Sequence, residues 1–282
     1  MITVLEVIKK TAEFLASKGV ESPRLNAEVL VGHALGLTRM KLYLQFERTL
    51  TEQELELIRP LVRRRSQREP LQYILGYVDF SGMRIKVDSR ALIPRPETEY
   101  LIELVKDRFS NNHPTTILDL GTGTGVIALA LAKQFQNAHI TAVDLSDGAL
   151  ELARDNIDTL GFASRIDLIR SSWFNEVSTM IEYDLIISNP PYLTKSEVDQ
   201  AAIEVSKFEP IKALIAEEEG LSDIKIILKS AIFRLSSNGI IALETGENQH
   251  DEIKTLAKDI GYSEIESQKD LANRDRFIFL RK

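Results

Sequence analysis

Apolar residues recur at every third or fourth position through the first seventy residues, which is the spacing of one face of an α-helix. In the opening segment these positions are Val4, Val7, Ile8, Phe14 and Leu15. Several short helices of this kind predict a small bundle over residues 1–70. No residue pattern within the bundle indicates catalysis.

Signals at the predicted helix ends agree with this interpretation. Ser22 followed by Pro23 has the form of an N-cap with proline at the first helical position. In "LTEQEL", Thr51 and Glu54 have the spacing of a capping box. Pro60 is expected to kink or end the helix that begins there, because proline lacks an N–H group and its ring clashes with the preceding turn.

The pattern changes after residue 70. The segment "LQYILGYVDFSGMRIKV" alternates around a "DFSG" turn and predicts a β-hairpin, which we assign to a linker over residues 71–96. "LIPRPETEYLIELV" then returns to helical spacing after two prolines. Beyond it, strands are predicted at 116–121, 139–145, 165–171, 183–189 and 239–245, and helices at 125–135, 146–161 and 221–235. Such alternation predicts an α/β domain over residues 97–282, with a parallel sheet and helices on both faces.

Composition narrows the class of protein. With 282 residues, 44% of them hydrophobic, the chain is long enough for one large domain or two smaller ones. No apolar stretch approaches the roughly 20 residues that span a bilayer, and the first residues lack the features of a secretory signal. We therefore expect a cytoplasmic protein without a membrane segment. There are no cysteines, and the four histidines lie far apart, so no metal site is predicted.

The formal net charge of -7 argues against broad electrostatic binding of nucleic acid. One local cluster of positive charge contrasts with this balance, and its members are Arg59, Arg63, Arg64, Arg65 and Arg68. A solvated helical face and a docking patch for an acidic partner or RNA both remain open for it.

Ligands of parallel α/β sheets bind beyond the carboxyl ends of the strands. The first of these ends carries a glycine-rich loop made of Gly121, Thr122, Gly123, Thr124 and Gly125. The missing side chains let a ligand approach the backbone and the helix N-terminus, although a turn needed only for tight packing is the alternative. Val126 stands where a dinucleotide fingerprint needs a small residue, and no P-loop lysine follows.

Two further strand ends supply groups for a nucleoside. Asp144, after the second strand, is placed to accept both hydroxyls of a ribose, unless it serves only as a helix N-cap, a role that Ser146 can also take. Trp173, the only tryptophan, is placed to stack on an adenine, unless it packs in the core as Phe174 is expected to do. A nucleoside site without a pyrophosphate fingerprint favours S-adenosylmethionine over NAD.

At this point the sequence resembles the class I S-adenosylmethionine-dependent methyltransferases, in which "NPPY" handles nitrogen atoms next to planar π-systems. The motif stands here at Asn189, Pro190, Pro191 and Tyr192. The side-chain oxygen of Asn189 and the carbonyl of Pro190 are expected to accept the two N–H groups of a substrate amide and to turn its nitrogen toward the methyl donor. Tyr192 is expected to form a flat wall beside the planar group. A plain turn is the alternative use of two prolines.

The rest of the chain resembles the release factor glutamine methyltransferases, which modify the glutamine of the Gly-Gly-Gln motif in class 1 peptide chain release factors. The matching segments are "EPLQYILGYVDFSG", "LIPRPETE", "LDLGTGTGVIALALA", "SNPPY", "KFEPIKALIAEEEGL" and "DLANRDR". The resemblance implies a mostly parallel seven-stranded sheet after the helical bundle, and S-adenosylmethionine as cofactor. It implies cofactor contacts from the 121–125 loop, Asp144, Trp173 and Asn189, and catalytic roles for Asn189, Pro190 and Tyr192.

Residues 189–192 as a whole would hold the substrate glutamine by this similarity, and Arg95 and Glu97 would help to frame the site. Two positions depart from the family pattern. Ser172 stands where an acid often contacts the adenine amino group, and Asn273 stands where glycine is common. Asparagine tolerates a positive φ angle better than most residues, so little effect is expected at position 273.

The substrate suggests a use for the N-terminal bundle. A glutamine on an exposed loop offers little contact area, whereas a specific protein interface buries roughly 800 Å² per partner, so we expect the bundle to help hold the release factor. Reversing Arg63, Arg64 and Arg65 to glutamate would then raise KM for the factor. The alternatives are a nucleobase methyltransferase, disfavoured by the acidic balance, a nicotinamide oxidoreductase, disfavoured by Val126, and a cofactor-binding scaffold without turnover.

Overall fold

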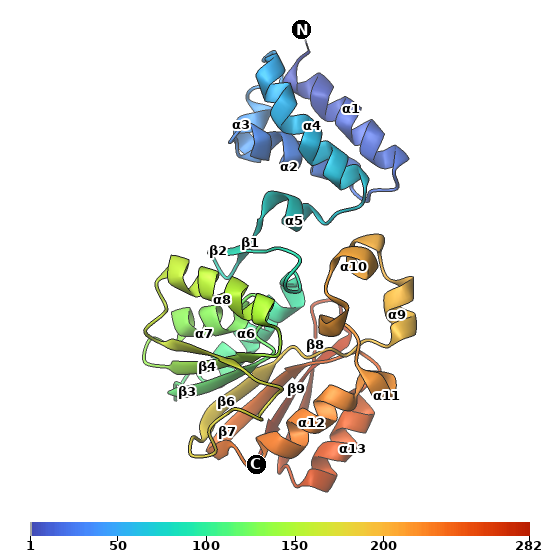
Figure 1. Cartoon of the computed structure of the whole chain (residues 1–282). Coiled ribbons are helices and arrows are strands. Elements are labelled where there is room, and N and C mark those ends of the chain that lie inside the picture. Colours follow the sequence, from blue (N-terminus) through green and yellow to red (C-terminus); the bar gives the residue numbers. More distant parts are fainter. Residues whose placement is uncertain (1) are drawn as a thin grey trace. The chain divides into compact units, whose positions relative to one another are not determined.

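The computed structural model describes residues 2–282, which divide into two compact units (Figure 1). The first unit contains Met1–Tyr77 and the short segment Ala202–Phe208, and the second contains Val78–Ala201 and Glu209–Lys282. The boundary after Tyr77 lies inside the range 71–96 that we expected to link the domains. No sequence pattern indicated that residues 202–208 would cluster with the N-terminal unit.

The N-terminal unit is helical. Its elements are α1 (Val4–Ser17), α2 (Pro23–Ala34), α3 (Arg39–Tyr43), α4 (Glu52–Ser66), α5 (Leu71–Leu75) and α10 (Ile203–Phe208). The apolar face that the sequence predicts for α1 is buried, since Val4, Ile8 and Leu15 are at most 1% exposed. Val4 and Ile8 pack with Ala27 and Val31 of α2. The predicted helical bundle is therefore confirmed.

Three predictions about helix ends have different outcomes in the structure. The capping box of Thr51 and Glu54 is present, with both reciprocal hydrogen bonds formed. Ser22 precedes α2 as expected but adopts a left-handed conformation with φ of 47°, and its side chain makes no capping bond, so that part of the prediction was wrong. Helix α4 does not end at Pro60 but continues to Ser66, with Val62 packed against the core of the unit.

Most side chains of the arginine cluster bind acidic groups of their own unit. Arg65 and Arg68 each place a guanidinium nitrogen 2.7 Å from the carboxylate of Glu204 in α10. In addition, Arg64 pairs with Glu69 and Arg59 with Glu52. Within residues 2–282, Arg63 is the member of the cluster whose side chain has no hydrogen bond or ion pair, although its carbonyl accepts from the Ser66 hydroxyl at 2.8 Å. Internal ion pairs therefore account for most of the cluster.

The second unit is an α/β domain. Its strands are β1 (Tyr77–Phe80), which begins at the unit boundary, β2 (Met83–Lys86), β3 (Thr116–Leu120), β4 (His139–Asp144), β5 (Ile166–Arg170), β6 (Tyr183–Ser188), β7 (Leu235–Glu244), β8 (Glu264–Lys269) and β9 (Asp275–Arg281). Its helices are α6 (Pro96–Arg108), α7 (Val126–Gln134), α8 (Asp147–Leu160), α9 (Lys195–Gln200), α11 (Glu217–Gly220), α12 (Ser222–Ala231) and α13 (His250–Ile260), with a 3₁₀ turn at Ile211–Ala213.

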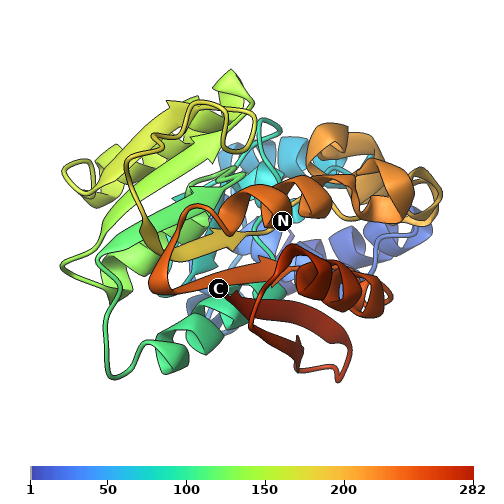
Figure 2. The same cartoon turned by 90° about the horizontal axis from the view of Figure 1, so that it is seen from below.

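Strands β1 and β2 pair as the predicted hairpin, and the other seven strands form one sheet in the order β5-β4-β3-β6-β7-β9-β8. The first five of these strands are parallel, whereas β9 runs antiparallel to both β7 and β8. Helices α12 and α13 cover one face of the sheet, and α6, α7 and α8 lie on the other (Figures 1 and 2). The expected mostly parallel seven-stranded sheet is confirmed.

The core of this unit lies between the sheet and α12 and α13. Leu118, Ile186 and Ile241 come from three neighbouring strands and meet Ile224 and Ile253 from the two helices. Apolar side chains on both faces explain why the strands read as nearly continuous hydrophobic runs. No helix in the described range 2–282 is long and apolar enough to cross a membrane.

Candidate active site

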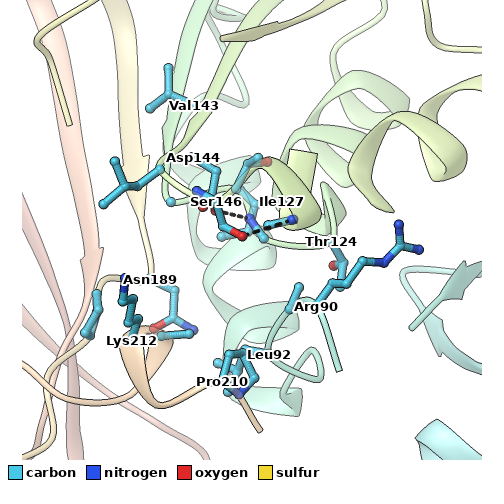
Figure 3. A pocket seen from close by; sticks show the side chains of 18 of the residues that line it. Arg90, Leu92, Thr124, Ile127, Val143, Asp144, Ser146, Asn189, Pro210 and Lys212 are labelled. Atoms are coloured by element: carbon cyan, nitrogen blue, oxygen red, sulfur yellow. Dashed lines mark hydrogen bonds between the residues drawn. The ribbon is translucent and has the colours of Figure 1, made fainter. Parts of the chain in front are cut away.

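A cavity of about 740 Å³ opens where the predicted strand ends meet in the second unit. Its wall contains the glycine-rich loop after β3, Asp144 at the end of β4, Trp173 after β5, and Asn189 after β6. Figure 3 shows Asp144 and Asn189 on this wall, with Ser146 beside Asp144. The parallel register aligns Leu120 with both Val143 and Ser188, which brings these loops to one edge of the sheet.

The glycine-rich loop needs glycine for conformation and for packing. Gly121, Gly123 and Gly125 have φ angles of 74°, 56° and 79°, a region that residues with a side chain rarely adopt. A Cβ atom at Gly125 would also stand 3.2 Å from the Cβ of Ala153 in α8. Thr122 and Thr124 between them are buried and line the cavity. The loop thus presents bare backbone at the start of α7, where a ligand can approach.

Asp144 is held by the backbone and keeps capacity for a ligand. Its Oδ2 accepts the amide of Gly123 at 2.9 Å, and its Oδ1 accepts the amide of Ser146 at 2.9 Å. Burial raises the pKa of Asp144, and these amides oppose the rise. Each carboxylate oxygen retains a second lone pair, so a vicinal diol can bind both oxygens. Ser146 supplies the N-cap of α8, accepting from the amide of Ala149, which leaves Asp144 free of that role.

Trp173 lines the cavity and is fixed by a residue that the sequence analysis did not identify. Its φ angle is 50°, and its Nε1 donates to Oδ1 of Asp223 in α12 at 3.0 Å. Asp223 also lines the cavity, and burial raises its pKa. Phe174 is buried in the core, as expected, so the indole is the aromatic group left to the cavity. Ser172, where the family resemblance led us to expect an acid, lies on the wall as well.

Asp119 is a second residue next to the cavity loop that the sequence analysis did not identify. It lies in β3 just before the glycine loop and is 0% exposed. Its Oδ2 accepts the hydroxyl of Thr122 at 2.6 Å, while its Oδ1 is buried without a partner in the described chain. Burial raises the pKa of Asp119 to about 7, although the Thr122 bond acts against it. An acidic residue inside the apolar strand of "LDLG" could have indicated a buried carboxyl group before the glycine loop.

The Asn-Pro-Pro-Tyr corner follows β6 and is anchored to the rest of the unit. Asn189 Nδ2 donates to the hydroxyl of Thr98 in α6 at 3.1 Å, and that hydroxyl donates to Oε2 of Glu244 at 2.7 Å. The phenol of Tyr192 donates to the other oxygen of Glu244 at 3.2 Å. The carbonyl of Tyr192 accepts from Gln249 Nε2 at 2.9 Å. Both ends of the corner are therefore fixed through groups outside it.

The four predicted residues of this corner differ in their placement. Asn189 and Pro191 line the cavity, and Pro190 is buried. Tyr192 is half-buried against the core and does not line the cavity, with the guanidinium of Arg276 5.6 Å from its ring centre. The structure therefore brings the Asn189 side chain into the cavity together with Asp144 and Trp173.

Of the two residues expected to frame the site, one lies in the cavity wall. Arg95 lines it and pairs with Glu209, whose other oxygen accepts the amide of Ile93 at 3.1 Å. This joins the "IPRP" loop to the "FEP" segment. Glu97 does not line the cavity, and it bonds instead to Arg274 at 3.1 Å.

Asn273, the second departure from the family pattern, has a φ angle of 63°, which agrees with the tolerance expected of asparagine. For metal binding, no group of three or more His, Cys, Asp or Glu side chains within the described part of the chain has a suitable arrangement.

The chemical groups that line the cavity fit a nucleoside cofactor. It combines a carboxylate with two free lone pairs, an indole ring and glycine backbone without side chains. These are the groups that bind a ribose diol, a planar base and an adjoining polar chain.

Comparison with known proteins identifies the domains and the fold. Residues 6–76 match the family model described as "PrmC N-terminal domain", and residues 96–207 match "Methyltransferase small domain". Among solved structures, the chain resembles the hMettl16 catalytic domain with a TM-score of 0.61 at 16% identity, over 78% of this chain and 80% of that one. It also resembles an rRNA methyltransferase from T. Thermophilus solved with AdoMet, with a TM-score of 0.54 at 16% identity, over 73% and 49%. At these identities the likeness shows the methyltransferase fold alone.

Sequence relatives identify the family. A release factor glutamine methyltransferase of Rhodopirellula baltica is 39% identical, over 99% of this chain and 96% of its own length. One of Chlorobaculum tepidum is 38% identical over 97% and 95%, and one of Geobacter sulfurreducens is 37% identical over 98% and 95%. Matches of this extent cover the helical unit and the α/β unit together. The chain therefore belongs to the release factor glutamine methyltransferase family.

Proposed function

We propose that this protein transfers a methyl group from S-adenosylmethionine to the side-chain amide nitrogen, N5, of the glutamine in the Gly-Gly-Gln motif of class 1 peptide chain release factors. The modification would support translation termination in the cytoplasm. The observation that carries the proposal is the Asn189 side chain, which lies in the same cavity as Asp144 and Trp173. A nucleoside site and an acceptor for a planar N–H group thus adjoin one another.

The residues that would hold S-adenosylmethionine are those of the nucleoside site. Asp144 would bind the two ribose hydroxyls through its free lone pairs, and Trp173 would stack on the adenine. The loop of residues 121–125 would lie against the methionine part, and Asn189 would border its reactive end. When bound, the cofactor supplies an electrophilic methyl group on a sulfonium.

The substrate amide needs orientation because its nitrogen lone pair is delocalised into its own carbonyl. Asn189 Oδ1 and the Pro190 carbonyl would accept its two N–H groups and so fix the plane of the amide. As the nitrogen gains positive charge during transfer, both acceptors bind it more strongly, which stabilises the transition state over the ground state. Pro190 and Pro191 keep the backbone rigid because their φ angles are fixed.

Tyr192 would act at the edge of this arrangement. Burial raises the pKa of Tyr192, and the neighbouring Glu244 carboxylate raises it further, so the phenol stays protonated and remains a donor to Glu244. The fixed ring does not line the cavity, so Tyr192 would hold the corner in place and would not itself form the expected wall along the planar amide. Arg95, held by Glu209, would border the same space.

The N-terminal unit would help to hold the release factor. Its exposed apolar residues include Met40 and Leu44, which are 72% and 81% exposed. Apolar residues of this kind favour contact with a folded protein partner. We expect no direct nucleic-acid binding, because the net charge is -7 and most of the arginine cluster is paired internally.

The proposal is tested by incubating the protein with labelled S-adenosylmethionine and a class 1 release factor. A second factor, with Gln→Ala in its Gly-Gly-Gln motif, serves as the matched control. We expect one methyl group on the glutamine side chain of the first factor, located by tandem mass spectrometry, and none on the second. Label on both factors, or on neither, contradicts the proposal.

A further inference from the structure

A buried chain of hydrogen bonds leads from the Asn189 side chain into the interior of the unit. It runs from Glu244, the last residue of β7, through the hydroxyl of Thr98 in α6 to Asn189 Nδ2. Glu244 is 1% exposed and Thr98 2% exposed. None of the sequence motifs assigned a role to Thr98 or to Glu244.

The order of donors along this chain follows from chemistry. A carboxylate can only accept hydrogen bonds. The Thr98 hydroxyl must therefore donate its single proton to Glu244 Oε2, 2.7 Å away. The oxygen of that hydroxyl can then act toward Asn189 only as an acceptor. It therefore requires the NH2 group of Asn189, and the amide oxygen Oδ1 must be the atom on the opposite side of the amide.

This orientation matters because the two atoms of an amide have nearly equal size but opposite hydrogen-bonding roles. With Oδ1 toward the substrate, Asn189 accepts an N–H group. Turned by half a rotation, it would present its own NH2 group to the substrate NH2 group, and two donors would face each other. Packing alone distinguishes these states poorly, whereas the buried chain distinguishes them by the direction of its protons.

The hydrogen bonds that the Glu244 carboxylate accepts maintain that direction. Burial raises the pKa of Glu244, and the hydroxyls of Thr98 and Tyr192 and the guanidinium of Arg276 oppose the rise, while Glu97 adds to it. These groups come from α6, from the Asn-Pro-Pro-Tyr corner and from β9. Because two hydroxyls donate to it, the carboxylate is satisfied in the interior without a donor from water.

We propose that Thr98 and Glu244 are positioning residues, which set the side-chain amide of Asn189 in the one orientation that accepts the substrate N–H group. The same carboxylate fixes the Tyr192 phenol, so one buried group determines both ends of the corner. This inference rests on the proposed function, because it concerns the atom of Asn189 that meets the substrate glutamine.

The test compares Thr98→Val, which removes the hydroxyl at nearly constant volume, with Thr98→Ser, which keeps it. We expect kcat for methylation of the release factor to fall about 10- to 100-fold in Thr98→Val, because the acceptor is no longer aimed. The Kd of S-adenosylmethionine, measured by calorimetry, should stay within about threefold. Thr98→Ser should restore kcat to within about threefold of the wild type.

Glu244→Gln provides a second variant, which keeps the shape of the side chain but permits either proton direction. It should lower kcat as Thr98→Val does, with the Kd of the cofactor again retained. If Thr98→Val fails to fold, Glu244→Gln alone tests the positioning role. Wild-type kcat in Glu244→Gln, or equal loss in Thr98→Ser and Thr98→Val, overturns the inference. A wild-type protein that leaves the release factor unmethylated contradicts the proposed function instead, so the two failures are distinguishable.

Discussion

Asp144 combines a structural role with a place in the cavity wall. Its two oxygens bind the amides of Gly123 and Ser146, and so tie the glycine loop to the start of α8. The spare lone pairs on the same oxygens face the cavity that the residue lines. The identity of this residue was predictable from its place after the second strand. Its hydrogen bonds to the backbone were not, because they depend on where the glycine loop folds back.

We predict that Asp144→Asn weakens binding of S-adenosylmethionine about 10- to 100-fold, because one charge-assisted acceptor becomes a donor. Calorimetric titration with the cofactor measures the change. The matched control is Asp158→Asn, at an exposed position of α8, the helix that follows Asp144. This change should leave Kd unchanged. Equal affinities for the wild type and Asp144→Asn would remove the ribose role.

At the scale of elements, the Asn-Pro-Pro-Tyr corner depends on a second segment at the end of α11. Gly220 there has a φ angle of 84°, and a Cβ atom on it would stand 2.1 Å from the carbonyl oxygen of Tyr192. Gln249, just before α13, donates to the same carbonyl and to that of Glu219. The close approach of Gly220 and the side-chain amide of Gln249 therefore hold the corner, and no local sequence pattern reveals either contact.

Gly220→Ala should destabilise the protein by at least about 2 kcal/mol more than Gly161→Ala. Both glycines have a similar φ angle, 84° and 79°, but nothing lies within 4 Å of the Cβ position at Gly161. The conformational cost, about 1–2 kcal/mol, is thus common to both variants, and the difference reports the clash with Tyr192. Urea unfolding measures both values, and equal losses would mean that the loop moves aside freely.

The elements themselves were largely predictable, for reasons that differ along the chain. Strands β3 and β6 are apolar runs that end just before Gly121 and just before Asn189-Pro190, and β4 is one that ends at Asp144, so pattern and breakers agree. Strand β8, Glu264–Lys269, alternates weakly and is largely exposed at the sheet edge, which is why periodicity did not indicate it. In the site, the motif residues were found, whereas Thr98, Asp223 and Glu244 were missed. Only the fold brings Thr98 and Asp223 to the cavity wall and Glu244 into contact with Thr98 and Tyr192.

At the scale of the whole molecule, one segment belongs to the first unit although the sequence around it belongs to the second. Residues 202–208 cluster with the N-terminal helices, where Glu204 binds Arg65 and Arg68. Sequence analysis left open whether these arginines form a solvated face or a docking patch. Reversal of Arg63, Arg64 and Arg65 together would break internal pairs, so Arg63→Glu alone is the cleaner test of docking to the release factor.

The Glu204 pairs predict a pH dependence of stability. Partial burial alone would raise the pKa of Glu204, but Arg68 and Arg65 outweigh it and lower the pKa to about 2 from the ordinary 4.5. The unfolded chain then binds more protons between these values, so stabilisation present above about pH 4.5 is lost as the pH falls toward 2. After allowance for screening by water, the loss is on the order of 1–2 kcal/mol.

Urea unfolding of the wild type and Glu204→Gln across this pH range measures the effect. The variant should lack the Glu204 part of the acid-induced loss, so the two stability curves should converge as the pH falls. Glu13→Gln, at an exposed position of α1, is the control and should follow the wild type. Parallel curves for the wild type and Glu204→Gln would show that the pairs contribute nothing to folding.

The central claim is that Asn189 presents an acceptor to the amide nitrogen that receives the methyl group. Its most direct test is the single-turnover rate of methyl transfer to the release factor by Asn189→Ala, with cofactor and factor both saturating. We predict a rate at least about 100-fold below the wild type, with the unfolding midpoint in urea unchanged. A rate within about threefold of the wild type, or a loss that merely follows lost stability, would contradict the account.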